Sequence, residues 1–107
     1  IGPRLAMELA LTGDFVTAQR AYDMGLINRV TDGPALDAAL ELAAAITANG
    51  PLAVARSKQV IVESREWTVE DMWGKQAETL GNLFMTEDAR EGAAAFAEKR
   101  KPNWKGR

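Results

Sequence analysis

The sequence contains no cysteine and no histidine among its 107 residues. The absence of cysteine excludes disulfides, thiolate nucleophiles and cysteine metal sites. The absence of histidine removes the commonest general base and metal ligand, so Ser–His and Cys–His catalytic pairs are excluded as well. Carboxylates could still act as general acids or bases.

Long hydrophobic runs are also missing. No apolar run approaches the roughly 20 residues of a membrane-spanning helix, and no signal peptide is visible. The glycines form neither a GxGxxG pattern nor a phosphate-binding P-loop. The net charge of -2 favours neither nucleic acid nor an anionic membrane. We therefore expect a cytoplasmic protein with no membrane partner and no nucleic-acid partner.

The composition is that of a globular but alanine-rich chain. Hydrophobic residues make up 47% of it, which excludes an intrinsically disordered protein. Alanine contributes little buried area per residue, so helices of this kind are expected to need a neighbour. The chain begins with Ile1-Gly2-Pro3-Arg4, which is typical of a helix entrance. We therefore expect a part of a longer protein.

Helix start and stop signals recur along the chain, with apolar residues at helical spacing between them. They predict helices within residues 2–13, 18–24, 35–50, 51–64, 69–84 and 85–100. The stretch LINRVT, residues 26–31, alternates apolar and polar residues, which predicts a strand. A strand needs a partner for its backbone groups, and the chain offers none. The predicted fold class is mainly α, with five to six helices and one short strand.

Few side chains in the sequence indicate a catalytic or metal-binding role. The carboxylates fall mostly on polar helix faces, which favours a solvated role. Glu8, inside an apolar helix, could pair with Arg4 four residues earlier. Trp67 and Trp73 are interpreted as packing anchors. We therefore predict no complete active site, with no catalytic residue and no metal ligand in this chain.

The last predicted helix differs from the others. Thr86 is its expected N-cap, and Glu87 and Asp88 follow at its positive end. Phe96 belongs to its apolar stripe and Lys99 comes three residues later, so the two could present an aromatic face beside a cation. This pair suits a ligand with a flat ring and a phosphate. Two alternatives stay open: Phe96 is core and Lys99 a helix-terminal charge, or the basic end of the chain binds RNA.

Two stretches resemble a known family. AMELALTGDFVTAQRAYDMGLINRV, residues 6–30, is similar to the segment that follows the catalytic core in the enoyl-CoA hydratase/isomerase (crotonase) family. TEDAREGAAAFAEKRKPNWKG, residues 86–106, resembles that family's C-terminal signature, in which Asp, Glu-Gly, Ala-Phe, Lys-Arg, Pro and an aromatic residue recur. The order of the two stretches also fits.

The resemblance implies a parent protein with a core of repeated ββα turns and C-terminal helices that build a trimer or hexamer. Residues 1–33 would end that core, and residues 34–107 would form the helical oligomerisation region. The family's oxyanion hole and the two glutamates of its hydratases would lie before Ile1. The chain alone is therefore expected to be inactive.

The resemblance also implies a role for the last helix. In similar hydratases the aromatic residue and the lysine of this signature approach the adenine and 3′-phosphate of coenzyme A, often on a neighbouring subunit. The matching residues are Phe96 and Lys99, and Leu80 is expected to line the same region. The implied parent reaction is hydration of trans-2-enoyl-CoA in fatty-acid metabolism, with the coenzyme A thioester as substrate and no further cofactor. The alternatives are another reaction of the family (double-bond isomerisation of enoyl-CoA or hydrolysis of acyl-CoA) and a non-catalytic helical interaction module.

Overall fold

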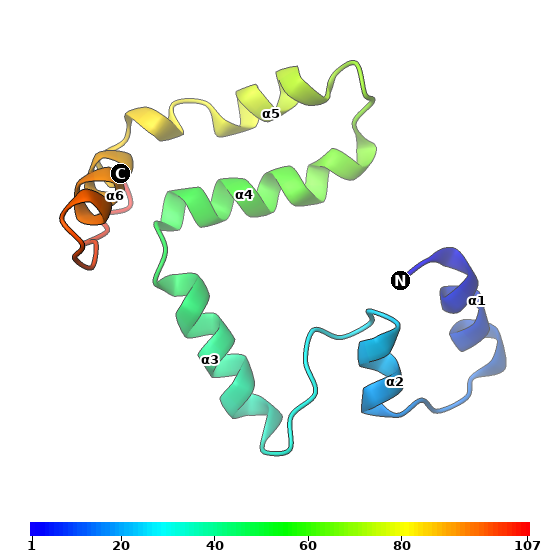
Figure 1. The fold of residues 1–107 in the computed structure, drawn as a ribbon. Coiled ribbons are helices and arrows are strands. Elements are labelled where there is room, and N and C mark those ends of the chain that lie inside the picture. Colours follow the sequence, from blue (N-terminus) through cyan, green and yellow to red (C-terminus); the bar gives the residue numbers. More distant parts are fainter. The chain divides into compact units, whose positions relative to one another are not determined.

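The computed structural model describes residues 1–107. Helices follow one another along the chain in the order shown in Figure 1. The chain divides into two compact units, Ile1–Ala39 and Leu40–Arg107. The predicted division after residue 33 concerned the parent's core and its oligomerisation region, and it stays a prediction.

The N-terminal unit contains two helices whose ends follow from local sequence signals. Helix α1 (Pro3–Thr12) starts with proline in its first turn and ends at Gly13, which has a left-handed φ of 68°. Helix α2 (Ala18–Asp23) starts after Thr17, whose Oγ1 accepts a hydrogen bond from the Arg20 N–H at 3.1 Å. These capping contacts satisfy backbone groups that a helix end would otherwise leave unpaired, and they confirm both predicted helices.

The predicted strand at residues 26–31 is wrong, because the structure has no strand there. The N–H groups of Leu26 and Ile27 both donate to the Ala21 carbonyl, at 2.8 and 3.4 Å. These donors return to the end of α2 instead of pairing across a ladder. A strand forms only where a second strand accepts its hydrogen bonds, and this chain supplies none. Every regular element of the chain is helical.

The C-terminal unit is built around α4 and α5. Helix α3 (Ala35–Thr47) crosses the boundary between the units, and Pro51 opens α4 (Pro51–Glu63) as predicted. A 3₁₀ turn, η1 (Ser64–Glu66), follows α4. Helix α5 (Met72–Leu80) then runs beside α4 in the opposite direction, as Figure 1 shows. The two helices therefore form an antiparallel hairpin.

Helix α5 is shorter than the predicted helix at residues 69–84. Before it, Thr68 Oγ1 accepts a hydrogen bond from the Asp71 N–H at 3.2 Å in a local turn. After it, Gly81 takes φ 50° and ψ -126°, a conformation open essentially to glycine alone. A 3₁₀ turn, η2 (Leu83–Met85), follows. The apolar periodicity thus continues in the sequence past the point where the backbone leaves the helix.

Helix α6 (Glu87–Ala97) has the predicted N-cap. Thr86 Oγ1 accepts a hydrogen bond from the Ala89 N–H at 3.1 Å. Residues 98–107 contain no further helix and fold back along α6, as the red end of the ribbon in Figure 1 shows. These ten residues are called the C-terminal hook below.

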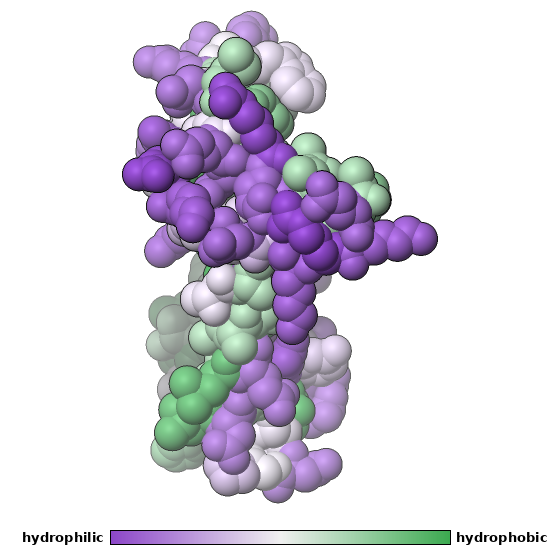
Figure 2. Space-filling model, turned by 90° about the vertical axis from the view of Figure 1, so that its left-hand side faces the viewer, coloured by the Kyte–Doolittle hydropathy of each residue, from purple (hydrophilic) through white to green (hydrophobic).

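The chain encloses almost no hydrophobic core of its own. Ala21 and Ala95 are its only buried apolar residues, and Figure 2 shows hydrophobic side chains open on the surface. Trp73 is 71% exposed and Trp67 is half-buried, so the interpretation of Trp73 as a packing anchor stays a prediction. No single helix is long and apolar enough to cross a membrane; α3 and α4 with η1 reach that length and composition only together, and they are bent at the break between them. The apolar helix faces are available to another surface.

Candidate functional site

The C-terminal end of α6 is closed by Lys99 in a left-handed conformation. Its φ of 53° is the only positive value on a residue other than glycine. The Lys99 N–H donates to the Phe96 carbonyl at 3.2 Å, and the Arg100 N–H donates to the Ala95 carbonyl at 3.0 Å. Helix α2 ends with the same pair of bonds, but Gly25 occupies the left-handed position there. A lysine in this conformation is strained by about 1 kcal/mol relative to glycine, so its surroundings must hold it.

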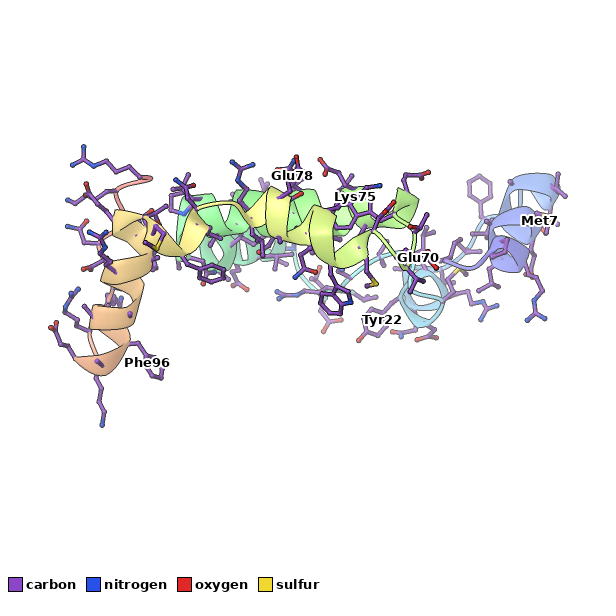
Figure 3. The ribbon with its side chains drawn as sticks, turned by 90° about the horizontal axis from the view of Figure 1, so that it is seen from above. Met7, Tyr22, Glu70, Lys75, Glu78 and Phe96 are labelled. Atoms are coloured by element: carbon purple, nitrogen blue, oxygen red, sulfur yellow. The ribbon has the colours of Figure 1, made fainter.

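Two of the three predicted binding residues lie three residues apart at the end of α6, and both are exposed. Phe96 lies on the last turn of α6 and is 87% exposed, and Figure 3 shows its ring standing clear of the helix. Lys99 is exposed as well. Within this chain Ala95, and not Phe96, is the buried apolar residue of this helix, and both interpretations of Phe96 stay predictions. Leu80 is half-buried at the end of a separate element, α5.

Two of the five basic residues at the chain end are paired with carboxylates. Arg100 contacts Glu91 at 2.6 Å and Glu98 at 2.5 Å, and Arg107 contacts Glu87 at 3.2 Å. The remaining three form no ion pair: Lys99, Lys101 and Lys105. Non-specific nucleic-acid binding uses many phosphate contacts, and three free cations are few for that purpose.

Asp88 holds the end of the C-terminal hook. Its carboxylate accepts hydrogen bonds from the N–H groups of Lys105 and Gly106, at 2.6 and 2.9 Å. Its own N–H donates to the Arg107 carbonyl at 3.0 Å. The residue is 5% exposed and is the only buried charged group of the chain. The carboxylate replaces its lost hydration with two backbone donors, which is the condition for burying a charge.

Glu91 holds the beginning of the same hook. It accepts hydrogen bonds from both terminal nitrogens of Arg100, at 2.6 and 3.0 Å, and from the Asn103 N–H at 2.7 Å. The Arg100 hydrogen bond, followed by that of Asn103, lowers the pKa of Glu91 to about 2. The same contact raises the pKa of Arg100. The pair is therefore ionised at any pH at which an enzyme is ordinarily assayed.

Trp104 joins the hook to the junction of α3 and α4. Its indole Nε1–H donates to the Ala48 carbonyl at 2.8 Å. The ring lies against Gly50 and Gly92, where a Cβ atom would come within 3.5 and 3.1 Å of ring atoms. Glycine at these two positions lets the backbone approach the indole closely. The hook is thus connected to two helix ends far from it in the sequence.

The arrangement at the end of α6 supports binding more readily than catalysis. An exposed phenyl face can stack on a flat ring, and a nearby ammonium can contact an anionic group. An apolar groove of about 290 Å³ lies beside Trp104, but its lining includes none of Phe96, Lys99 and Leu80. No group of three or more histidine, cysteine, aspartate or glutamate residues is placed to hold a metal ion.

Comparison with known proteins shows the family. The model of the family described as enoyl-CoA hydratase/isomerase matches residues 1–107. Enoyl-CoA hydratase EchA19 of Mycobacterium tuberculosis is 46% identical over 104 residues, which are 96% of this chain and 39% of that protein. Carnitinyl-CoA dehydratase of Proteus mirabilis is 39% identical over 110 residues, which are 98% of this chain and 42% of that protein. The chain therefore belongs to the enoyl-CoA hydratase/isomerase family.

The solved structures give the same relationship. A crystal structure of enoyl-CoA hydratase from Mycobacterium tuberculosis matches with a TM-score of 0.95 and 52% identity, over 100% of this chain and 43% of that one. Our chain corresponds to the C-terminal part of the crotonase fold. It spans about two-fifths of the length of the relatives that it matches.

Reasoning from single residues missed the contacts of Asp88, Glu91 and Trp104. Asp88 was predicted as a charge at the helix N-terminus, and it does lie there, but its carboxylate binds the hook 17 and 18 residues further along. Glu91 was predicted as solvated, and Trp104 received no role. All three coincide with residues of the family signature, and this coincidence was the one available signal.

Proposed function

We propose that this chain is the C-terminal part of an enoyl-CoA hydratase that adds water across the double bond of a trans-2-enoyl-CoA. Within that enzyme the chain contributes Phe96 and Lys99, with Leu80, to the coenzyme A site. The catalytic glutamates and the oxyanion hole lie elsewhere in the enzyme. The coenzyme A thioester is the substrate, and no further cofactor takes part.

One observation carries the binding part of the proposal. An aromatic ring that is 87% exposed lies one helical turn from an unpaired lysine, and that lysine keeps its place in an unfavourable backbone conformation. An exposed phenyl face can stack on a flat ring and an unpaired ammonium can contact a phosphate, so a site for such a ligand would use both groups.

The choice of reaction has separate support. The relatives described above are named for hydration or dehydration of coenzyme A thioesters, two directions of one reaction class. This favours hydration over double-bond isomerisation and thioester hydrolysis. The near absence of a core in the chain supports the further proposal that its helices cover the rest of the enzyme and meet copies of themselves in a trimer or hexamer.

The decisive experiment is an assay of the full-length enzyme with crotonyl-CoA and longer trans-2-enoyl-CoA substrates. We expect hydration of at least one chain length, measured by loss of the conjugated enoyl absorbance, and sedimentation as a trimer or hexamer. Inactivity with every chain length, together with isomerase or hydrolase activity, would select the alternative reactions. A monomer would reject the proposed subunit contacts.

Replacing Lys99 with alanine is expected to raise the KM for enoyl-CoA in the full-length enzyme by about five- to thirtyfold, with kcat nearly unchanged. The reason is the loss of one charge-assisted contact to a phosphate that is remote from the reacting double bond. Steady-state kinetics over a range of substrate concentrations will measure both constants.

Two further variants separate binding from stability. Lys99→Gly removes the same ammonium but relieves the left-handed strain, so it should raise KM equally while the melting temperature increases. Lys101→Ala removes a neighbouring unpaired cation and should leave KM unchanged. An unaltered KM in both Lys99 variants would contradict the proposed contact.

A further inference from the structure

Contacts of the backbone and of the next residue, Arg100, flank Lys99 on both sides. Lys99 lies between two fixed points: the backbone bonds to the Phe96 and Ala95 carbonyls, and the side chain of Arg100. The backbone bonds alone also close α2, where glycine occupies the left-handed position without strain. At the end of α6 a second restraint is present, namely the ion pair of Arg100 with Glu91.

The Glu91 carboxylate restrains the hook at two points. Both terminal nitrogens of Arg100 donate to it in a fork, and the Asn103 N–H donates to it as well. The residues on the C-terminal side of Lys99 are therefore tied to a residue two turns earlier in α6. A bidentate arginine–carboxylate pair fixes direction as well as distance, which a lysine partner would not do.

Other ion pairs in the region do not share this arrangement. Glu98 also contacts Arg100, at 2.5 Å, but its side chain is 61% exposed, against 22% for Glu91. The pair of Glu87 and Arg107 lies at the other end of α6 and has a single contact at 3.2 Å. Glu91 is thus the one carboxylate that is partly buried, pairs with both terminal nitrogens of an arginine and also accepts a hydrogen bond from a backbone N–H.

We propose that Glu91 is a positioning residue for coenzyme A: through Arg100 it holds the backbone of Lys99 in the left-handed conformation, and the ammonium of Lys99 contacts the 3′-phosphate from there. This inference rests on the proposed function of Phe96 and Lys99. It assigns Glu91 and Arg100 to the site although neither touches the ligand. The low pKa of Glu91 fits this role, because the restraint then persists at every working pH.

The experiment uses the full-length enzyme and measures binding of coenzyme A and of 3′-dephospho-coenzyme A by calorimetry, so it needs no hydratase activity. Glu91→Gln keeps the size of the side chain and removes its charge. We expect it to weaken coenzyme A binding by about tenfold and 3′-dephospho-coenzyme A binding by less than about twofold. Glu87→Gln, which removes a carboxylate of the same helix, should change neither affinity.

Two variants distinguish positioning from a general loss of structure. Arg100→Lys keeps the positive charge but cannot form the bidentate pair with Glu91. It should weaken the binding of coenzyme A more than that of 3′-dephospho-coenzyme A, even if Glu91→Gln folds poorly. In a Lys99→Ala background, Glu91→Gln should produce no further loss, because the group that it positions is gone.

The outcomes separate the inference from the proposal beneath it. If Lys99→Ala abolishes the preference for the 3′-phosphate but neither Glu91→Gln nor Arg100→Lys reduces it, the positioning role is overturned and the site stands. If Lys99→Ala leaves the preference intact, the proposed site fails and the inference fails with it. Equal weakening of both ligands by Glu91→Gln and Arg100→Lys would show a structural role alone and would also overturn the inference.

Discussion

Replacing Asp88 with alanine is expected to destabilise the protein by about 3 kcal/mol, because each hydrogen bond to a charged group contributes about 1.5–3 kcal/mol and the two are not additive. The change removes the acceptor for the N–H groups of Lys105 and Gly106 and leaves both donors without a partner. It also removes a negative charge from the N-terminal turn of α6. Urea denaturation of the full-length enzyme will measure the loss.

Matched variants test whether the lost hydrogen bonds cause the loss of stability in Asp88→Ala. Asp88→Asn keeps one oxygen as an acceptor, so it should cost less than alanine. Asp71→Ala removes an exposed aspartate whose one ion pair, with Lys75, spans 3.4 Å, and such pairs contribute at most about 1 kcal/mol. Limited proteolysis should cut the hook of Asp88→Ala first. Equal stability of the Asp88→Ala and Asp71→Ala proteins would contradict the account.

Replacing Trp104 with alanine is the second change with a large expected effect, a loss of about 2–3 kcal/mol, somewhat below the usual cost of removing a fully buried aromatic side chain. The indole covers Gly50 and Gly92. Its Nε1–H bond to the Ala48 carbonyl is lost as well. Denaturation monitored by circular dichroism avoids relying on the tryptophan fluorescence that the change removes.

Trp104→Phe separates the two contributions. Phenylalanine keeps most of the ring contact but has no N–H, so this variant should lose about 1 kcal/mol, the usual net contribution of one hydrogen bond. Because Asp88 and Trp104 hold the same ten residues, the double alanine variant should lose less than the sum of the single losses. Full additivity would show that the hook is not one cooperative element.

Much of the local structure could be predicted from the sequence. Proline at the start of α4, threonine before α6 and glycine after α1 each act on backbone groups within four residues, so their effect needs no distant partner. Family membership was predictable for a related reason. The two signature stretches, residues 6–30 and 86–106, keep their residues at characteristic spacings, and the family comparison confirms that resemblance.

The predictions that differ from the structure share one physical cause: they depend on contacts with groups that are distant in the sequence or absent from this chain. The strand predicted at residues 26–31 had the right alternation, but no neighbouring strand accepts its hydrogen bonds. The stripe predicted to continue to Phe84 was broken by the backbone of Gly81. Phe96 belongs to the predicted apolar stripe of α6, and nothing in this chain covers its ring. Periodicity shows which residues share a face, but not whether another surface meets that face.

The sequence by itself determined the helical character of the chain, most helix ends and the family. The tertiary structure alone decided how the last ten residues are held. Glu91 bonds to a backbone group 12 residues away, Asp88 to groups 17 and 18 residues away, and Trp104 to one 56 residues away. Such contacts depend on where the chain returns in space, and no pattern of neighbouring residues encodes that return. Only the structure shows that Lys99 takes a left-handed conformation just after the end of α6 and that Phe96, three residues earlier, is exposed.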